Sequence, residues 1–178
     1  RCDECDYAIS FMKGDIPYPE CHLRMPCWMN NGPVRRTGKI EQYSKDRKSL
    51  LSRHTRFCSF VYSNGNAPER IHFLRLLSRY KHVDCGGMVM NNMGSCVRDK
   101  IAFCSSCKFT IAFENYPAAG YVTEKLFDSL AALSLPIYWG APDAGMEANP
   151  SRFVNAADFS TPEALAEYVI RLDQDEDL

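Results

Sequence analysis

The sequence contains one loop whose side chains are suited to binding a phosphorylated sugar. Carboxylates can bind sugar hydroxyls, lysine can neutralise phosphate as a point charge, and tyrosine can stack and donate a hydrogen bond. All three residue types, together with an amide, occur between a strand-like run and a helix-like run, as Glu114, Asn115, Tyr121, Glu124 and Lys125. The simpler alternative is a polar loop followed by an ordinary Glu-Lys helix start.

A second loop, residues 63–70, ends on an arginine in the expected first turn of a helix. Cations are mildly unfavourable at a helix N-terminus, where the helix dipole is positive. Arg70 makes sense there if an anion lies between its guanidinium and the free backbone N–H groups. The alternative is a surface arginine paired with a neighbouring acid.

Other catalytic patterns are not apparent. The sequence has neither a Walker pattern nor GxGxxG, which argues against phosphate-loop NTPases and dinucleotide dehydrogenases. Its four histidines are scattered, without a partner at metal-ligand spacing, and no nucleophile with a histidine base is visible. We therefore expect no metal site.

Nine cysteines are many for a chain of this size. They include two Cys-x-x-Cys pairs, Cys2/Cys5 and Cys104/Cys107. Three interpretations are open: a zinc-stabilised interaction domain, a redox pair, or structural cysteines that are buried or disulfide-bonded. We favour structural cysteines, because Cys21 and Cys27 are spaced too widely for a regular zinc knuckle.

From residue 56 onward, patterns typical of buried strands alternate with patterns typical of amphipathic helices. We expect strands at 57–62, 83–85, 109–113, 135–139 and 153–154. We expect helices that start after an Asn66 cap, over 97–105, after a Thr123 cap, and at a Ser160–Glu163 capping box. Residues 1–56 look irregular, with a short strand at 7–11 followed by loops and a connector.

This alternation predicts an α/β fold, a Rossmann-like parallel sheet covered by helices on both faces. Ligands of such sheets bind at the carboxyl ends of the strands. The candidate site is therefore the set of loops at 63–70, 114–125 and 140–147.

Composition agrees with a globular domain and limits its partners. The chain has 178 residues, 46% of them hydrophobic, and a formal net charge of −1. A nearly neutral chain gives no reason to expect a nucleic-acid partner. No apolar run approaches the roughly 20 residues of a membrane helix, and no signal-peptide pattern is visible. Because the chain opens without Met, we expect a fragment whose targeting signals are missing.

The loop residues also form a family signature. Its most specific block is Tyr121-Val122-Thr123-Glu124-Lys125. The other matching segments are Asp6-Tyr7-Ala8-Ile9, Leu23-Arg24-Met25-Pro26, Ser63-Asn64 to Arg70, Gly86-Gly87, Asn91-Asn92, Gly94, Phe113-Glu114-Asn115, Gly120, Pro136-Ile137-Tyr138-Trp139-Gly140 and Phe153-Val154-Asn155. Through them, nearly the whole chain resembles the α-1,3-fucosyltransferases of glycosyltransferase family 10, and its Tyr-Trp-Gly variant is closer to bacterial members.

The resemblance implies a GT-B architecture of two Rossmann-like domains facing across a cleft. Residues 1–56 would be the end of the N-terminal acceptor domain and the connector, and 57–178 the domain that binds GDP-fucose. The implied reaction is the inverting transfer of L-fucose from GDP-fucose to a GlcNAc or glucose hydroxyl of an oligosaccharide, glycoprotein or glycolipid.

The resemblance also implies roles for the loop residues. Arg70 and Lys125 would hold the pyrophosphate and stabilise the charge that develops on the leaving GDP. Glu124 would bind sugar hydroxyls of the donor, and Tyr121 and Asn115 would complete the pocket. The catalytic set is thus Arg70, Lys125 and Glu124, with no metal or cofactor required.

In this family the general base is a carboxylate of the acceptor domain, which we expect upstream of Arg1. The 178 residues alone would then transfer little fucose. The alternative is a non-catalytic module that binds a GDP-sugar. The compartment is left open: the Golgi membrane, lumenal side, for a eukaryotic protein, or the cytoplasm or peripheral inner membrane for a bacterial one. Membrane association would come only from segments not present here.

Overall fold

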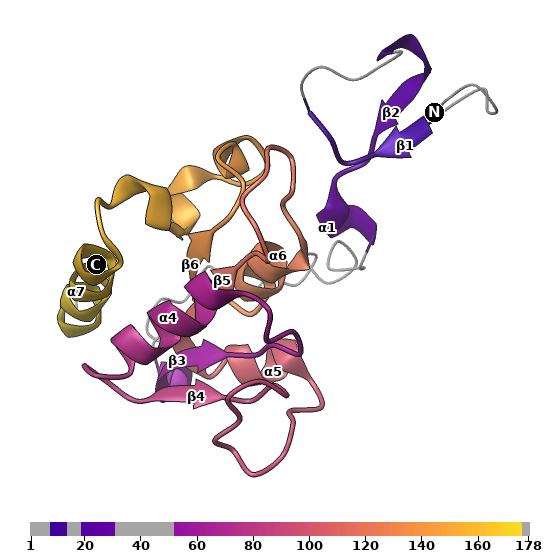
Figure 1. Cartoon of the computed structure of the whole chain (residues 1–178). Helices are drawn as coiled ribbons and strands as arrows, with labels where there is room; N and C mark the ends of the chain where they lie inside the picture. Colours follow the sequence, from indigo (N-terminus) through magenta and orange to yellow (C-terminus); the bar gives the residue numbers. More distant parts are fainter. Residues whose placement is uncertain (1–7, 14–18, 31–51, 176–178) are drawn as a thin grey trace.

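The computed structural model of the chain describes residues 8–13, 19–30 and 52–175. Its centre is a five-stranded parallel sheet in the order β4-β3-β5-β6-β7 (Figure 1). The strands are β3 (Arg56–Phe60), β4 (Val83–Cys85), β5 (Cys107–Phe113), β6 (Leu135–Trp139) and β7 (Val154–Asn155). The predicted α/β class and Rossmann-like parallel sheet are confirmed.

Helices cover both faces of this sheet. They are α4 (Pro68–Leu77), α5 (Lys100–Cys104), α6 (Glu124–Ala131) and α7 (Pro162–Gln174), with short 3-10 turns η5 (Ala144–Met146), η6 (Pro150–Arg152) and η7 (Ala156–Asp158). Helices α4 and α7 pack against each other, as do α5 and α6 (Figure 1). Within the described ranges, no helix has the length and apolar character needed to span a membrane.

Alternation along β5 explains why both faces are covered. Ile111 and Phe113 belong to the apolar cluster that includes the buried side chains of α4 and α7. Ala112, between them, belongs to a second cluster with Leu126 of α6 and Tyr138 of β6. Because successive side chains of a strand point to opposite faces, an almost continuously apolar strand requires apolar partners on each side.

The helix starts differ in part from the predictions. Thr123 caps α6 as expected, accepting from the Lys125 N–H at 3.4 Å. The cap of α4 is Ala67 and not Asn66, with Pro68 in the first turn. Helix α7 is capped by Thr161, whose Oγ1 accepts from the Ala164 N–H, so the predicted capping box from Ser160 to Glu163 is wrong. Helix α5 covers only 100–104 of the expected 97–105.

The N-terminal segment contains more regular structure than predicted. The expected strand is present as β1 (Ala8–Ser10), and it pairs in parallel with β2 (His22–Arg24). A 3-10 turn, η2 (Pro19–Cys21), and helix α1 (Cys27–Asn30) were expected to be loop. Figure 1 shows β1 and β2 apart from the five-stranded sheet, with α1 between them and α6.

The cysteines of the described ranges are free. Cys58, Cys85, Cys104 and Cys107 are buried, as a structural role requires, and none of the seven described cysteines forms a disulfide, so the disulfide alternative is wrong for them. Burial raises the pKa of the Cys104 thiol, and raises that of Cys107 to about 11. Both thiols are therefore protonated at neutral pH, which argues against a reactive redox pair.

The structure bears on the zinc alternative but does not describe the N-terminal cysteine pair. In the part of the chain that the structure describes, no group of three or more His, Cys, Asp or Glu side chains is placed to hold a metal. Cys2 and Cys5 lie outside the described residues.

Candidate functional site at the switch point of the sheet

The connections that leave β3 and β5 run over opposite faces of the sheet. After β3 the chain enters α4, and after β5 it enters α6 on the other face. Between two neighbouring parallel strands whose connections diverge in this way, a crevice opens at their carboxyl ends. The loops at this crevice are the first two of the three that the sequence predicted.

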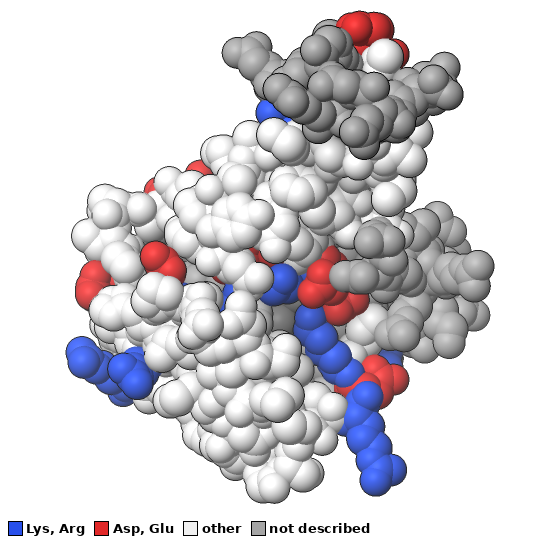
Figure 2. All heavy atoms as spheres, turned by 45° about the vertical axis from the view of Figure 1, so that its right-hand side comes forward, with Lys and Arg blue, Asp and Glu red and all other residues white. Residues whose placement is uncertain are grey.

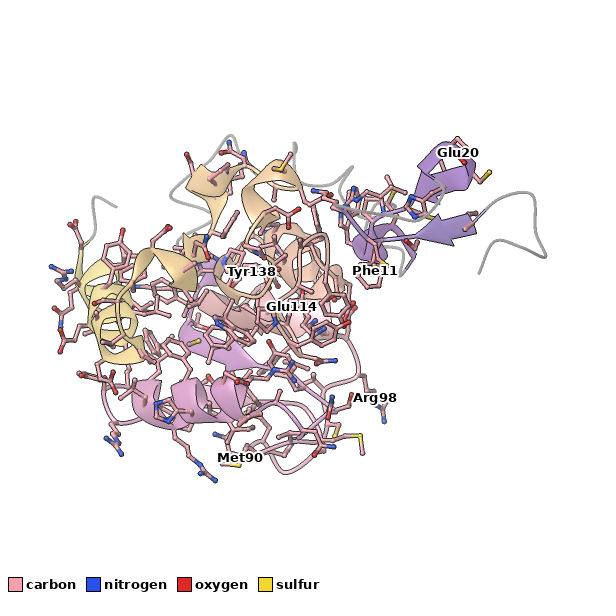
Figure 3. The ribbon with its side chains drawn as sticks, turned by 45° about the horizontal axis from the view of Figure 1, so that its top comes forward. Phe11, Glu20, Met90, Arg98, Glu114 and Tyr138 are labelled. Atoms are coloured by element: carbon pink, nitrogen blue, oxygen red, sulfur yellow. The ribbon has the colours of Figure 1, made fainter. Side chains whose placement is uncertain are left out.

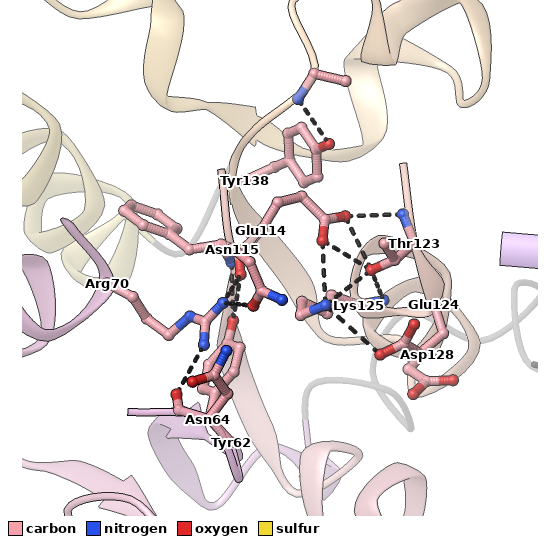
Figure 4. A network of polar contacts seen from close by, with 12 residues as sticks. Tyr62, Asn64, Arg70, Glu114, Asn115, Thr123, Glu124, Lys125, Asp128 and Tyr138 are labelled. Carbon is pink, nitrogen blue, oxygen red and sulfur yellow. Dashed lines mark hydrogen bonds and ion pairs between the residues drawn. The ribbon is translucent and has the colours of Figure 1, made fainter. Parts of the chain in front are cut away.

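Arg70 is buried at the crevice, although arginine is rarely a fully buried residue. Its side chain extends from the first turn of α4, and the residue is only 1% exposed. Nη2 donates to the Phe113 carbonyl at 3.0 Å and to Asn115 Oδ1 at 2.7 Å (Figure 4). Nη1 donates to the Asn64 carbonyl at 3.2 Å, and the guanidinium carbon lies 3.8 Å from the centre of the Tyr62 ring.

All of these partners of Arg70 are uncharged. Among the described residues, no carboxylate lies within ion-pair distance of its guanidinium, and Nε has no hydrogen-bond partner. A buried cation without a counter-ion is costly, and an anion bound beside it would offset that cost. The alternative of a surface arginine paired with an acid is therefore wrong.

Lys125 lies on the other side of the crevice, in the first turn of α6. Its ammonium is 3.1 Å from Glu114 Oε2, 3.0 Å from Thr123 Oγ1 and 3.7 Å from Glu124 Oε1. The side chain is 13% exposed. A partly open ammonium at a helix N-terminus can bind an anion together with the backbone N–H groups of that helix.

Glu114 is the buried acid beneath Lys125, and no specific role was assigned to it from the sequence. It is 0% exposed and accepts from the backbone N–H of Thr123 at 2.8 Å and from its hydroxyl. Burial raises the pKa of Glu114, and the ion pair with Lys125 only partly opposes this shift. The sequence could have indicated that Glu114 is paired, because an acid that directly follows a buried apolar strand must have a partner.

Arg70 and Lys125 line the same polar cavity, of about 170 Å³. It brings together four of the five predicted donor-binding residues: Arg70, Asn115, Glu124 and Lys125. Ser63 and Asn64 belong to the predicted loop 63–70, whereas Val61, Tyr62 and Lys100 were not predicted. Figure 2 shows basic and acidic side chains meeting at a hollow on this face of the molecule.

Tyr121 is not among the residues that line this cavity. Its ring stacks on Tyr116 with the ring centroids 4.5 Å apart, and it also contacts Phe11 at 5.3 Å. Burial raises the pKa of Tyr121 to about 12. The role of Tyr121 in donor binding stays a prediction, and the structure places the residue beside the cavity rather than in its wall.

The third predicted loop, residues 140–147, contacts the loop at 114–125. A Cβ added at Gly140 would lie 2.5 Å from Glu114 Cγ and 2.8 Å from the Tyr138 hydroxyl, so only glycine fits there. Further along, Asp143 accepts from the Gly120 N–H at 2.8 Å. No residue of the 140–147 loop lines the polar cavity. The loop instead packs against the 114–125 loop, which contributes Asn115, Glu124 and Lys125 to the cavity.

A larger cavity, about 430 Å³, lies on the α4 and α7 side of Phe113. Its walls are mostly apolar, with Phe73, Trp139, Phe159 and Leu165 among them. Neither lysine nor arginine is among the residues that line it, and so the smaller polar cavity better fits the chemistry that the loop residues indicate.

Comparisons with known proteins show to which family the chain is similar. Residues 51–178 match the model of glycosyltransferase family 10 (fucosyltransferase), C-terminal part. The chain is 42% identical to the alpha-(1,3)-fucosyltransferase FucT of Helicobacter pylori, over 92% of this chain and 40% of that protein. It is 31% identical to glycoprotein 3-alpha-L-fucosyltransferase A of Drosophila melanogaster, over 79% of this chain and 29% of that protein.

Solved structures are similar over almost the whole chain. A crystal structure of alpha1,3-fucosyltransferase with GDP-fucose aligns with a TM-score of 0.80 at 30% identity, covering 97% of this chain and 59% of that one. A second, with GDP, aligns with a TM-score of 0.81 at 29% identity, covering 97% and 58%. The chain thus spans about 40% of its Helicobacter relative and somewhat more than half of these solved chains. On the family match and these identities, the chain belongs to glycosyltransferase family 10, the fucosyltransferases.

Proposed function

We propose that this chain binds GDP-fucose with its diphosphate in the polar cavity at the switch point. We further propose that its protein is an α-1,3-fucosyltransferase, which transfers L-fucose from this donor to a GlcNAc or glucose hydroxyl of a glycan, with inversion. Support comes from the family, from relatives named as α-1,3-fucosyltransferases and from a similar structure solved with GDP-fucose. The linkage, the acceptor and the activity of the whole protein are part of the proposal, because the chain spans only part of those relatives.

One observation carries the proposal. The buried Arg70 guanidinium has only uncharged partners among the described residues, and Lys125 lines the same cavity. Two cations at the end of a parallel sheet, one of them without a counter-ion, suit the diphosphate of a nucleotide sugar.

The chemistry follows from the charges. When the bond between fucose and the β-phosphate breaks, negative charge develops on the leaving GDP. Arg70 and Lys125 would stabilise this charge more strongly in the transition state than in the bound donor, which is what accelerates the step. Because side-chain cations supply this stabilisation, we expect that neither a metal nor another cofactor is required.

The remaining residues of the cavity would orient the donor. Glu124 would accept hydrogen bonds from sugar hydroxyls, and Asn115 would hold Arg70 while facing the ligand. The general base belongs to the acceptor side and is not assigned to any described residue. Since relatives come from both bacteria and animals, both predicted compartments stay part of the proposal.

Calorimetric titration of the chain with GDP-fucose tests the donor site, with GDP-mannose and UDP-galactose as competing nucleotide sugars. We expect selective binding of GDP-fucose. Arg70→Ala and Lys125→Ala should each weaken it by roughly 2–4 kcal/mol, because each removes a charged partner of the diphosphate in a largely desolvated cavity.

Arg75→Ala is the matched control, an exposed arginine five residues along the same helix. It should leave the affinity unchanged. If a folded chain binds all three nucleotide sugars equally, or if both cavity variants bind as well as the wild type, the site assignment is wrong.

A further inference from the structure

Glu114 has no place in the proposed chemistry, yet it is the most thoroughly enclosed charged group of the site. It does not line the cavity and is 0% exposed. Figure 3 shows it next to Tyr138, inside the ribbon. Burying a carboxylate is costly unless it is paired and hydrogen-bonded, so its position calls for a reason.

The hydrogen bonds of the Glu114 carboxylate to described residues all lead to the start of α6. One oxygen, Oε1, accepts from the backbone N–H and the hydroxyl of Thr123, and Oε2 contacts that hydroxyl at 2.8 Å and Lys125 Nζ at 3.1 Å (Figure 4). A single carboxylate therefore holds both the cap of the helix and the cation that follows it.

Within the part of the chain that the structure describes, these contacts leave one N–H of the Lys125 ammonium without a hydrogen-bond acceptor. An ammonium has three N–H donors. Glu114 Oε2 takes one and Thr123 Oγ1 takes another, at 3.0 Å. Glu124 Oε1, at 3.7 Å, is beyond hydrogen-bond distance. The third donor is available to a ligand in the cavity that Lys125 lines.

The Glu114 side chain is closely packed on the side of Gly140. Gly140 packs so closely that an added Cβ would approach Glu114 Cγ to 2.5 Å and Cβ to 2.9 Å. Tyr138 fills the space on the same side, and its hydroxyl accepts from the Ala141 N–H at 3.1 Å. A rigid anchor of this kind holds a flexible lysine side chain in one rotamer before the ligand arrives, which lowers the entropy lost on binding.

We propose that Glu114 is a positioning residue, which orients the Lys125 ammonium toward the diphosphate of the donor. The proposal rests on the proposed function of Lys125. It is specific, because Glu114 would act on the donor only through Lys125. A carboxylate this close to a diphosphate otherwise repels it, and a purely structural acid would matter equally with or without the lysine.

A double-mutant cycle on the affinity for GDP-fucose separates these possibilities. The chains compared are wild type, Glu114→Gln, Lys125→Met and the double variant, titrated by calorimetry. We expect Glu114→Gln to weaken binding about tenfold when Lys125 is present, and less than twofold when residue 125 is methionine. Glu163→Gln, an exposed glutamate on α7, controls for loss of one negative charge.

Two results would overturn the proposal. If Glu114→Gln weakened GDP-fucose binding equally with lysine and with methionine at position 125, Glu114 would have only a structural role. If Glu114→Gln tightened binding with either residue at position 125, the Glu114 carboxylate would repel the diphosphate. Failure of the proposed function looks different, since the wild type would then not bind GDP-fucose selectively.

Folding is checked by thermal melting and near-UV circular dichroism of every variant. Lys125→Met leaves Glu114 buried without its cation, so its Tm should fall, and the double variant should recover part of that fall. If Lys125→Met does not fold, Lys125→Gln, which can still donate to Glu114, takes its place in the cycle.

Discussion

The candidate site contains two buried charged residues, Glu114 and Arg70, whose surroundings differ in charge. Glu114 is surrounded by donors and a lysine, so the protein itself stabilises its charge. Among the described residues, Arg70 has only uncharged acceptors and a tyrosine ring as partners, so its charge remains to be balanced. A ligand anion would contribute most beside the second of these residues, because an unbalanced buried charge has the most to gain from a partner.

Gly140 should be the residue where a single methyl group disturbs the site. In Gly140→Ala the added Cβ meets Glu114 Cγ and the Tyr138 hydroxyl, both far inside van der Waals contact. We expect a loss of stability of roughly 1–3 kcal/mol by urea unfolding, together with weaker GDP-fucose binding, because Glu114 must shift.

Gly65→Ala is the comparison for this change. An added Cβ there has its nearest neighbour at 3.8 Å, which is ordinary contact. It should unfold at the same urea concentration as the wild type. Wild-type stability in Gly140→Ala would mean that the interior beneath Lys125 is not rigidly packed.

At the scale of elements, helix starts place the cations. Both α4 and α6 begin at the carboxyl end of a central strand, and both carry a cation of the site in their first turn. Thr123 has two roles at the start of α6, since it caps the helix and also donates a hydrogen bond to Glu114. This geometry directs the free N–H groups of the helix and the Lys125 side chain to the same side of the sheet.

At the start of α7, the observed cap, Thr161, differs from the predicted capping box that begins at Ser160. Thr161→Ala removes the side-chain acceptor for the Ala164 N–H, and we expect a loss of about 1 kcal/mol in unfolding free energy. Ser160→Ala should be close to neutral. Chemical denaturation of both variants decides the matter, and a larger loss in Ser160→Ala would contradict the observed cap.

At the scale of the whole molecule, Glu147 connects the N-terminal segment to the sheet domain, together with Asp143, which pairs with Lys13 at 2.7 Å. Glu147 contacts Arg24, accepts from Trp28 Nε1 at 3.1 Å and pairs with Lys13 at 2.9 Å. Trp28 also stacks on Phe127 of α6 at 4.3 Å. The segment therefore rests on the helix that carries Lys125. The division of the chain into domains at residue 56 stays a prediction.

This tie should depend on pH. Burial raises the pKa of Glu147, but its bonds from Lys13, Trp28 and Arg24 outweigh burial and leave the pKa below the ordinary value. A depressed pKa in the folded state means a contribution that is present above the unfolded value, about 4.3, and lost as the pH falls through the folded value.

Thermal melts of wild type and Glu147→Gln from pH 7 to pH 3 measure the effect. We expect the variant to melt about 2–4 °C lower at pH 7 and the difference to vanish at the acid end. Glu163→Gln should melt like the wild type throughout. A difference between wild type and Glu147→Gln that does not change with pH would show that Glu147 acts by packing alone.

The sequence by itself determined the order and nature of the elements of the sheet domain. The strand predicted at 135–139 has the same bounds in the structure, and the predicted cap at Thr123 is the observed one. Buried apolar runs and caps are local patterns, whose physical cause lies within a few residues. The two loops that line the polar cavity were located for the same reason, since each directly follows such a strand.

Only the tertiary structure decided which of those loop residues come together. The β4-β3-β5-β6-β7 order puts the crevice between β3 and β5, and brings Arg70 within reach of Asn115, 45 residues away. It also pairs Glu114 with Lys125 and turns Tyr121 toward Tyr116. Short elements such as β2 and α1 likewise had no readable pattern of their own. Burial and pairing depend on contacts between distant segments, and a local pattern carries no record of those contacts.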